Sequence, residues 1–215
     1  MGDPSRADVR ATYDEIADGF AATREYAWPE VVAFVERDAD GGGTALDLGC
    51  GNGRHSELLA EHVDRVLGVD ASRELLALAR ERATERGWAE TFAPVTGDAA
   101  TLPLPDDSVD VAVYVATLHH LPTRALRVES LRELGRVLTP DGRALVSAWS
   151  TEHDRFAGHD EGFDTTVDWT QPDGETVGRY YHIYDPAEFD ADLERAGLTV
   201  EERVVSSGNC YATIR

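Results

Sequence analysis

Short apolar runs alternate with amphipathic stretches along most of the chain. Residues 109–116 are nearly all apolar, as in a strand that is covered on both faces. Leu75, Leu76 and Ala79 follow Ser72 at helical spacing. Such alternation predicts a parallel sheet with helices on both faces. The expected strands are 44–48, 66–70, 91–96, 109–116, 143–149, 198–205 and 209–214, and the expected helices are 7–22, one after Pro29, 54–62, 72–86, 123–137 and 186–196.

Two regions depart from this alternation. Residues 150–178 are rich in Asp, Gly, Thr and His and show no period, so we expect a long loop there, typical of lids and binding loops. The last two strands, joined by 206–208, predict an antiparallel hairpin. At 215 residues the chain suits one α/β domain, 1–215, with a mostly parallel seven-stranded sheet. Its expected parts are N-terminal helices (1–40), a core (41–149), the loop (150–178) and a C-terminal segment (179–215).

Hydropathy and cysteine content exclude several classes of protein. No apolar run approaches the ~18 to 20 residues that span a bilayer, and residues 1–10 contain no apolar signal region. Cys50 and Cys210 provide neither a disulfide framework nor the spacing of metal ligands. We therefore expect a cytoplasmic chain with no metal site and no membrane partner.

The charge of the chain is unusual. Acidic residues number 41 against 20 basic ones, the formal net charge is −21, and every basic residue is arginine. At ordinary ionic strength this charge would repel itself strongly, whereas at molar salt the screening length falls to roughly 3 Å. The composition therefore predicts adaptation to a salt-rich cytoplasm, such as that of a halophilic archaeon. An acidic surface for a basic partner is the alternative, although the acids are spread evenly along the sequence.

A glycine-rich loop follows the first expected strand. Gly49, Gly51 and Gly53 stand directly behind the acidic Asp47, and glycines let the backbone turn sharply and approach a ligand closely. The next strand ends in Asp70, which can accept both hydroxyls of a ribose. The G-x-G-x-G spacing fits a dinucleotide site less well, because that site needs G-x-G-x-x-G. A tight turn without a ligand remains the alternative.

These elements together resemble the class I S-adenosylmethionine-dependent methyltransferases. The resemblance covers about 40–150 and implies the Rossmann-like fold of that class, with 41–149 as the core that binds S-adenosylmethionine. It implies that the glycine loop passes under the methionine portion, that Asp70 binds the ribose, and that Asp98 and Ala99 lie by the adenine. Asp98 has the alternative role of a turn residue. The implied cofactor-binding residues are Asp47, Gly49, Cys50, Gly51, Asn52, Gly53, Asp70, Asp98, Ala99 and Ala116.

Three further segments resemble a narrower family, the tRNA wobble-uridine carboxymethyl methyltransferases. They are Tyr13-Asp14-Glu15-Ile16-Ala17 with Phe20, Thr23-Arg24 and Trp28-Pro29; His119-His120 with Thr123-Arg124 and Arg127-Val128-Glu129; and Arg179-Tyr180-Tyr181-His182-Ile183-Tyr184 with Gly208-Asn209. This resemblance runs from about residue 9 to the C-terminus. It implies that the chain makes the methyl ester of 5-carboxymethyluridine in the tRNA anticodon loop. Two departures from the family are the short 150–178 segment, where eukaryotic relatives carry a lysine-rich insertion, and Cys210 in place of a tryptophan.

The chemistry of that reaction selects candidate residues. A carboxylate is ionised at neutral pH and needs no general base, but it needs an arginine to hold it by two hydrogen bonds. Aromatic side chains can stack on an unpaired base. The expected catalytic residues are Arg24, His119, Arg179, Tyr180 and His182, and the expected substrate-binding residues are Trp28, His120, Arg124, Arg127, Tyr181 and Asn209.

Several of these residues also have a purely structural alternative, and Arg24 is the least easily explained in that way. Arg124 and Arg127 are at the spacing of a salt-bridged helix face. Tyr180, Tyr181 and Trp28 could be core aromatics, and the two histidines could cap the loop. Two other functions remain open: methylation of a small-molecule acid or quinone-like hydroxyl, with His119 as general base, and a non-catalytic cofactor-binding subunit.

The family resemblance also implies a protein partner. Family members work with a small zinc-binding activator that pairs with the sheet edge, here Thr91 to Thr96, with Phe92 and Val95 as exposed apolar anchors. A chain of charge −21 is a poor nonspecific RNA binder, because phosphate contacts supply most of that affinity. We expect tRNA binding to depend on stacking, on a few arginines and on the partner.

Overall fold

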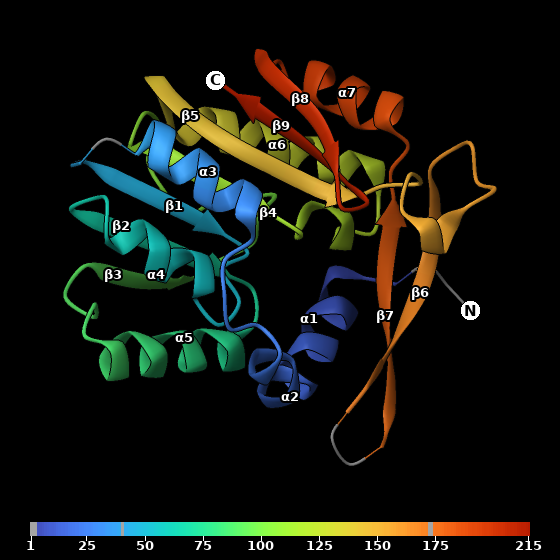
Figure 1. The fold of residues 1–215 in the computed structure, drawn as a ribbon, viewed down its shortest axis with the longest axis horizontal. Helices are drawn as coiled ribbons and strands as arrows, with labels where there is room; N and C mark the ends of the chain where they lie inside the picture. Colours follow the sequence, from blue (N-terminus) through green and yellow to red (C-terminus); the bar gives the residue numbers. More distant parts are fainter. Residues whose placement is uncertain (1–3, 40, 172–173) are drawn as a thin grey trace.

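A mixed seven-stranded sheet forms the centre of the molecule (Figure 1). The computed structural model describes residues 4–39, 41–171 and 174–215; residues 1–3, 40 and 172–173, which fall within the expected N-terminal region and loop, lie outside it. The strand order is β3-β2-β1-β4-β5-β9-β8, and the first five strands are parallel. The seven strands of the sheet are β1 (Thr44–Leu48), β2 (Arg65–Asp70), β3 (Phe92–Thr96), β4 (Val109–Val115), β5 (Leu138–Trp149), β8 (Val200–Ser206) and β9 (Asn209–Ile214).

The C-terminal strands run antiparallel to the rest of the sheet. β9 pairs with β5, and β8 pairs with β9, both antiparallel. The predicted seven strands and C-terminal hairpin are therefore confirmed. The fifth strand begins before the expected 143–149, because β5 starts at Leu138, and its register with β4 shifts between Val109 and Val111.

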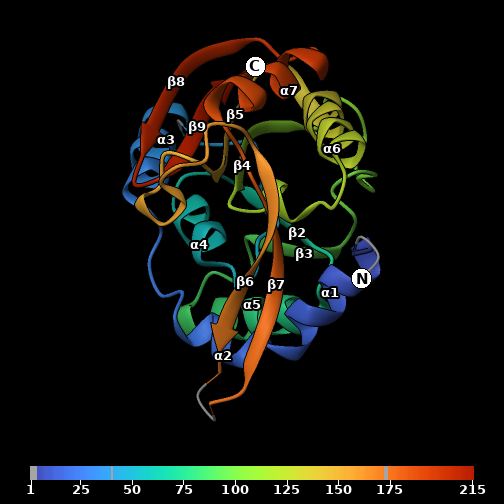
Figure 2. The ribbon, with the colours of Figure 1, turned by 90° about the vertical axis from the view of Figure 1, so that its right-hand side faces the viewer.

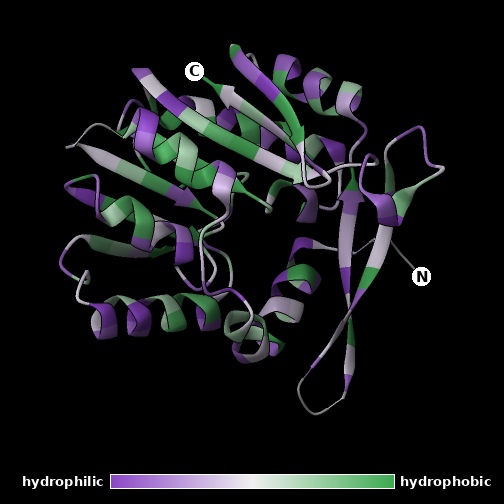
Figure 3. Ribbon diagram, in the orientation of Figure 1, coloured by the Kyte–Doolittle hydropathy of each residue, from purple (hydrophilic) through white to green (hydrophobic). Residues whose placement is uncertain are grey.

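Helices cover both faces of the sheet. One apolar core joins the strands to α6 (Arg124–Val137) and α7 (Pro186–Arg195). The second core lies on the opposite face, under α3 (Pro29–Asp38), α4 (Arg54–Ala60) and α5 (Arg73–Arg86). Figure 3 shows the apolar residues concentrated on the central strands and on the inner sides of these helices. No helix in the described part of the chain is long and apolar enough to cross a bilayer.

Local signals at the helix ends explain where the helices begin. The Ser72 hydroxyl accepts the Leu75 N–H and begins α5, and Gly87 ends that helix with a left-handed φ of 81°. The carboxylate of Asp185 caps α7 in the same way. Ser5 and Asp8 form a reciprocal cap at α1 (Arg6–Glu15), which is followed by the short α2 (Ala17–Ala22).

The prediction of a long loop at 150–178 is largely wrong. Phe163–Thr170 form β6, which pairs antiparallel with β7, Thr176–Ile183. Val167 is buried while Asp164 and Asp168 are exposed, so β6 has the period of two that its many polar residues concealed. Figure 1 shows this hairpin beside the sheet, and Figure 2 shows it running past the sheet toward α1 and α2. A short 3-10 helix, η2 (Asp154–Phe156), lies in the segment before it.

β3 is an edge strand, as the sequence predicts, but one of its expected anchors is wrong. Phe92 is only 8% exposed, because its ring packs against Trp88 and closely covers Gly68. Val95 is half-buried against the core. The outer edge of β3 is therefore open along its backbone, but it does not present Phe92.

Candidate active site

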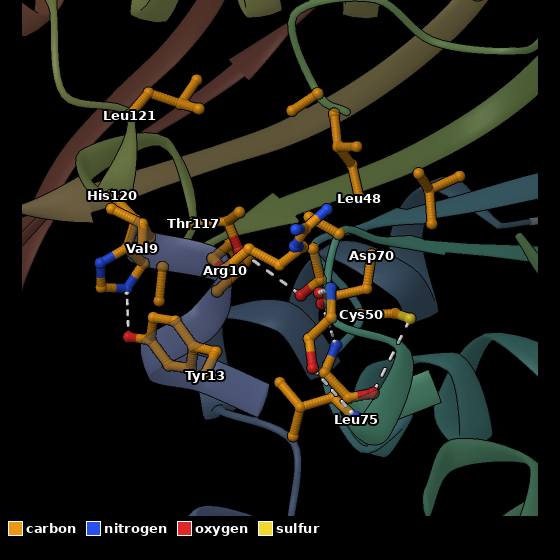
Figure 4. A pocket seen from close by; sticks show the side chains of 18 of the residues that line it. Val9, Arg10, Tyr13, Leu48, Cys50, Asp70, Leu75, Thr117, His120 and Leu121 are labelled. Carbon is orange, nitrogen blue, oxygen red and sulfur yellow. Dashed lines mark hydrogen bonds between the residues drawn. The ribbon is translucent and has the colours of Figure 1, made fainter. Parts of the chain in front are cut away.

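A cavity of about 630 Å³ opens at the carboxyl ends of β1, β2 and β4. This is the end of a parallel sheet where ligands bind in open α/β folds. Its floor comes from the loops after these strands, and its roof comes from α1 and the segment that follows α2. Figure 4 shows Tyr13 of the roof meeting His120 across the cavity from Asp70. Its volume lies within the usual range for a small-molecule site.

The glycine loop is held against the end of β2. The N–H of Gly49 donates to the Val69 carbonyl at 2.7 Å. The N–H of Gly51 donates to Asp70 Oδ2, and the N–H of Ser72 donates to Asp70 Oδ1, each at 2.8 Å. Each carboxylate oxygen keeps a lone pair for another donor, such as a sugar hydroxyl. Burial raises the pKa of Asp70, and the backbone N–H donors oppose that rise.

Most of the expected cofactor-binding residues line this cavity, but two do not. Gly49, Cys50, Gly51, Asn52, Asp70, Asp98, Ala99 and Ala116 line it. Asp47 lies below the cavity, where it accepts a hydrogen bond from Ser56 of α4 at 2.7 Å, and burial raises its pKa to about 7. Gly53 begins α4 beside Trp88. Asp47 and Gly53 therefore support the glycine loop without lining the cavity.

The other loop residues have distinct environments. Burial raises the pKa of the Cys50 thiol well above its usual value, so the thiol is unreactive. Asp98 Oδ1 accepts the Ala100 N–H at 2.9 Å, and its other oxygen pairs with Arg6 of α1. Ala116 has a left-handed φ of 54°, a strained conformation for a residue with a Cβ, at the end of β4.

Asn52 links the glycine loop to the roof. Its side-chain amide donates to the carbonyl of Ala21 at 3.2 Å and to that of Arg24 at 2.9 Å. The Arg24 side chain lines the cavity, and its guanidinium lies 4.3 Å from the centre of the Phe20 ring. The loop that the sequence assigns to the cofactor therefore also positions the backbone of Arg24.

Arg24 lies beside Arg179, as the sequence-based site requires. Both guanidinium groups lie over Trp169 of β6, at 5.4 Å and 5.3 Å from its ring centre. Burial lowers the pKa of Arg24, and the nearby positive charge of Arg179 lowers it further. Neither arginine forms an ion pair with a carboxylate in the described ranges. Two cations side by side without a counter-ion indicate an anion-binding region.

Two neutral histidines lie near these arginines, against the same Tyr181 ring that Arg179 contacts. The backbone N–H of Trp149 donates to His119 Nδ1 at 3.0 Å, so the ring carries its proton on Nε2. His120 Nδ1 donates to the Tyr180 carbonyl at 3.0 Å, so its Nε2 accepts from the Tyr13 hydroxyl at 2.8 Å. Burial lowers the pKa of His119 well below its usual value and lowers that of His120 to about 3. In these tautomers, neither ring offers a free basic nitrogen.

Alternate residues of β7 face opposite sides of the strand. Tyr181 lines the cavity and stacks on His119 with ring centres 4.9 Å apart. Arg179 lies on the same face of the strand, over the Tyr181 ring, but it does not itself line the cavity. Tyr180 and His182 point away: the Tyr180 hydroxyl donates to the Pro122 carbonyl, and His182 bridges Asp164 and Glu188. The expected catalytic roles of Tyr180 and His182 find no support in this geometry, because a strand presents every second residue to one face.

Three expected substrate-binding residues also lie outside the cavity. Arg124 pairs with Asp192 at 2.6 Å, and Arg127 lies 3.6 Å from Glu188, so both tie α6 to α7. Asn209 is buried opposite Trp149 in the β5–β9 pair. Both arginines therefore form ion pairs, as the structural alternative proposes, but with α7 and not along their own helix, and Arg127 is only 3% exposed. Trp28 and His120, in contrast, do line the cavity.

Sequence reasoning missed several residues of the site. Arg54, directly after the glycine loop, lines the cavity and lies 4.9 Å over the Trp28 ring; burial lowers its pKa to about 10. Its position in sequence was the signal that could have identified it. Tyr13 and Phe20 were quoted for the family resemblance without a role. The sequence does not indicate a role for Trp169, because the polar residues around it predict a loop in place of β6.

Comparisons with known proteins show which proteins the chain is similar to. The family model described as "Methyltransferase domain" matches residues 46–146. The mouse tRNA (carboxymethyluridine(34)-5-O)-methyltransferase ALKBH8 is 34% identical over 146 residues, which is 68% of this chain but 20% of the mouse protein. The chain thus spans about a fifth of that relative. The Encephalitozoon cuniculi protein ECU09_1500, provisionally named a methyltransferase, is 34% identical over 193 residues, 86% of this chain and 85% of that protein.

A solved structure extends the comparison to nearly the whole fold. A chain in the complex between the Haloferax volcanii Trm112 methyltransferase activator and a methyltransferase superposes with a TM-score of 0.71. The match covers 96% of each chain at 20% sequence identity. At that identity the likeness concerns the fold, which is the class I methyltransferase fold predicted from the sequence.

Proposed function

We propose that this chain, a class I S-adenosylmethionine-dependent methyltransferase that is similar to the tRNA carboxymethyluridine methyltransferases, forms the methyl ester of 5-carboxymethyluridine at the wobble position of tRNA. The observation that carries the proposal is that Arg24 and Arg179 lie together without a carboxylate partner among the described residues, near two histidines that offer no free base. Such a site suits a nucleophile that is already an anion. The proposal is tested by whether unmethylated carboxymethyluridine accumulates in tRNA when the chain is absent.

The cavity fits S-adenosylmethionine, the cofactor of this class. Asp70 would hold the ribose hydroxyls with its free lone pairs, and the open space beside Gly51 leaves room for the methionine portion. Arg54 is the cation that would face the methionine carboxylate. Asp98 forms an ion pair with Arg6, so it would contact the adenine either while it keeps that pair or after the pair breaks. When bound, the cofactor supplies a methyl group that is already activated by a positively charged sulfur.

The chain's own residues therefore align the acceptor instead of activating it. Alignment of two reacting groups supplies a large part of the rate where the nucleophile needs no deprotonation. Arg24 and Arg179 would hold the acceptor carboxylate, and His119 Nε2 carries a proton that it can donate to it. Tyr181, stacked on His119, offers an aromatic surface for an unpaired base. A hydroxyl acceptor would require His119 to act as a base, and the bond to Nδ1 works against that role.

We also infer a zinc-binding activator on the outer edge of β3. The strand ends the sheet, and an open edge is a place where a partner strand can pair. The Haloferax volcanii neighbour is a complex with such an activator protein. The opposite edge, β8, is the competing position, because Val204 and Val205 are 48% and 45% exposed there.

Hydrogen exchange separates these two edges. We expect the chain expressed alone to be poorly soluble or inactive, and a co-expressed activator to restore activity while slowing exchange of the backbone amides of residues 92, 93, 95 and 96. Slowed exchange confined to residues 200–206, or full activity and solubility of the isolated chain, would contradict the inference. We place the chain in a salt-rich cytoplasm because of its charge of −21, and molar KCl is therefore the assay condition.

A further inference from the structure

Two buried donor groups without partners lie side by side on the β6–β7 hairpin. Arg179 is 5% exposed, and its Nε and Nη1 have no hydrogen-bond partner in the described ranges. The indole Nε1 of Trp169 is also buried without one. Buried polar groups almost always find partners, and unsatisfied donors on a buried cation are especially costly. The fold therefore maintains a group of donors that suits an acceptor from outside the chain.

The pairing of the two strands brings these donors together. Arg179 lies opposite Val167, and Trp169 lies opposite Val177, so Trp169 and Arg179 are diagonal neighbours on one face. The guanidinium carbon of Arg179 lies 5.3 Å from the Trp169 ring centre, 5.8 Å from that of Phe20 and 5.2 Å from that of Tyr181. Flat aromatic walls on several sides favour a planar anion over a hydrated tetrahedral one.

The donors lie immediately behind the wall of the main cavity. Phe20, Arg24 and Tyr181 line that cavity and also contact Trp169 or Arg179. Arg24 is half-buried, and the only hydrogen bond of its guanidinium among the described residues is to the hydroxyl of Thr23. A turn of this side chain and of Phe20 would open the wall without any change in the sheet. The acceptor side of the cavity can therefore extend to the hairpin.

We propose that Trp169 completes an acid-binding subsite with Arg179 and Arg24, in which the indole N–H and the guanidinium groups bind the carboxylate of the acceptor base. This inference rests on the proposed function and adds a specificity-determining residue to it. Trp169 recognises the carboxylate by donating one hydrogen bond, while its ring packs beside the base. An amide in place of the acid removes the charge that the two arginines attract and offers one acceptor oxygen instead of two.

Calorimetric binding to the full-length chain tests the subsite directly. The probes are 5-carboxymethyluridine and its uncharged amide, 5-carbamoylmethyluridine. Trp169→Phe keeps an aromatic ring and removes the N–H. We expect this change to weaken binding of the acid about tenfold, the loss of one charge-assisted hydrogen bond, with little change for the amide. Trp88→Phe is the matched control, because Trp88 Nε1 is also buried without a partner but lies beside Phe92, away from the cavity.

Each outcome supports or overturns the subsite. Equal losses for acid and amide, or unchanged acid affinity in Trp169→Phe, overturn it, as does an equal effect of Trp88→Phe. Inorganic phosphate that displaces the acid from the wild-type chain at equal concentration would assign the donors to a phosphate instead. S-adenosylhomocysteine binding and the unfolding midpoint confirm that each variant is folded. If Trp169→Phe is unstable, Arg179→Lys replaces it; this variant keeps the charge but loses the two-pronged geometry, and it should weaken binding of the acid. Acid binding that depends on Trp169 in a chain that does not methylate tRNA would refute the proposed function and leave the subsite standing.

Discussion

Arg179→Gln is expected to lower methyl transfer to tRNA by a factor of about 10² to 10³, the usual cost of removing one preorganised donor from a reacting group. Glutamine keeps part of the volume but loses the charge and the two-pronged geometry. Affinity for S-adenosylhomocysteine should change little, because Arg179 lies behind Phe20 and Tyr181 and does not line the cavity at the glycine loop. Single-turnover kinetics with saturating tRNA and a separate binding titration provide the two measurements.

Arg24→Gln should reduce transfer to a similar extent. It differs in one respect, because the backbone of Arg24 is bound to Asn52 of the glycine loop and the side chain lines the cavity. A moderate loss of cofactor affinity is therefore expected in addition. Arg132→Gln is the matched control, since Arg132 is exposed and pairs with Glu129 on α6. Wild-type rates in both site variants would refute the assignment of the two arginines.

Gly49→Ala is expected to abolish cofactor binding and to destabilise the fold. A Cβ at this position would lie 2.1 Å from Oγ1 and 2.3 Å from Cγ2 of Thr117, and the residue has a φ of 75°. Left-handed backbone alone costs a residue with a Cβ about 1–2 kcal/mol. The collision adds to this, so either the loop or Thr117 must move, and Thr117 lines the cavity. Titration with S-adenosylhomocysteine and thermal unfolding measure the two effects.

Gly87→Ala separates the collision from the backbone strain. Gly87 has a φ of 81°, ends α5, and has open space where its Cβ would be. This variant should lose about 1–2 kcal/mol of stability, with cofactor affinity unchanged. If Gly49→Ala were no more harmful than Gly87→Ala, the close approach of the loop to Thr117 would not be what requires glycine.

The donor half of the site could be predicted from sequence because its signals are local. Three glycines, a strand before them and Asp70 at the end of the next strand follow in order, and parallel strands bring their carboxyl ends to one edge. The structure places all but Asp47 and Gly53 of the expected cofactor residues along the cavity. Asp47 was the least predictable, because it precedes the loop on a strand and its side chain turns toward Ser56.

The acceptor half depends on contacts that are distant in sequence. Arg24, His119 and Arg179 come from separate elements, and only the family resemblance grouped them. The same resemblance included Tyr180 and His182, which the strand period then turned away from the cavity. β6 was hidden because threonines and aspartates occupy its outer face. Without β6 there was no way to see Trp169, the side chain that lies beside both arginines.

The central claim is that the chain methylates the carboxylate of a wobble carboxymethyluridine. Mass spectrometry of the nucleosides in tRNA from a strain that lacks the chain tests it most directly, with the wild-type gene and an Arg179→Gln gene returned to the same strain. We predict that unmethylated carboxymethyluridine accumulates at the wobble position, that its methyl ester disappears, and that only the wild-type gene restores the ester. Wobble nucleosides that are unchanged in the absence of the chain would contradict the account and favour a small-molecule acceptor.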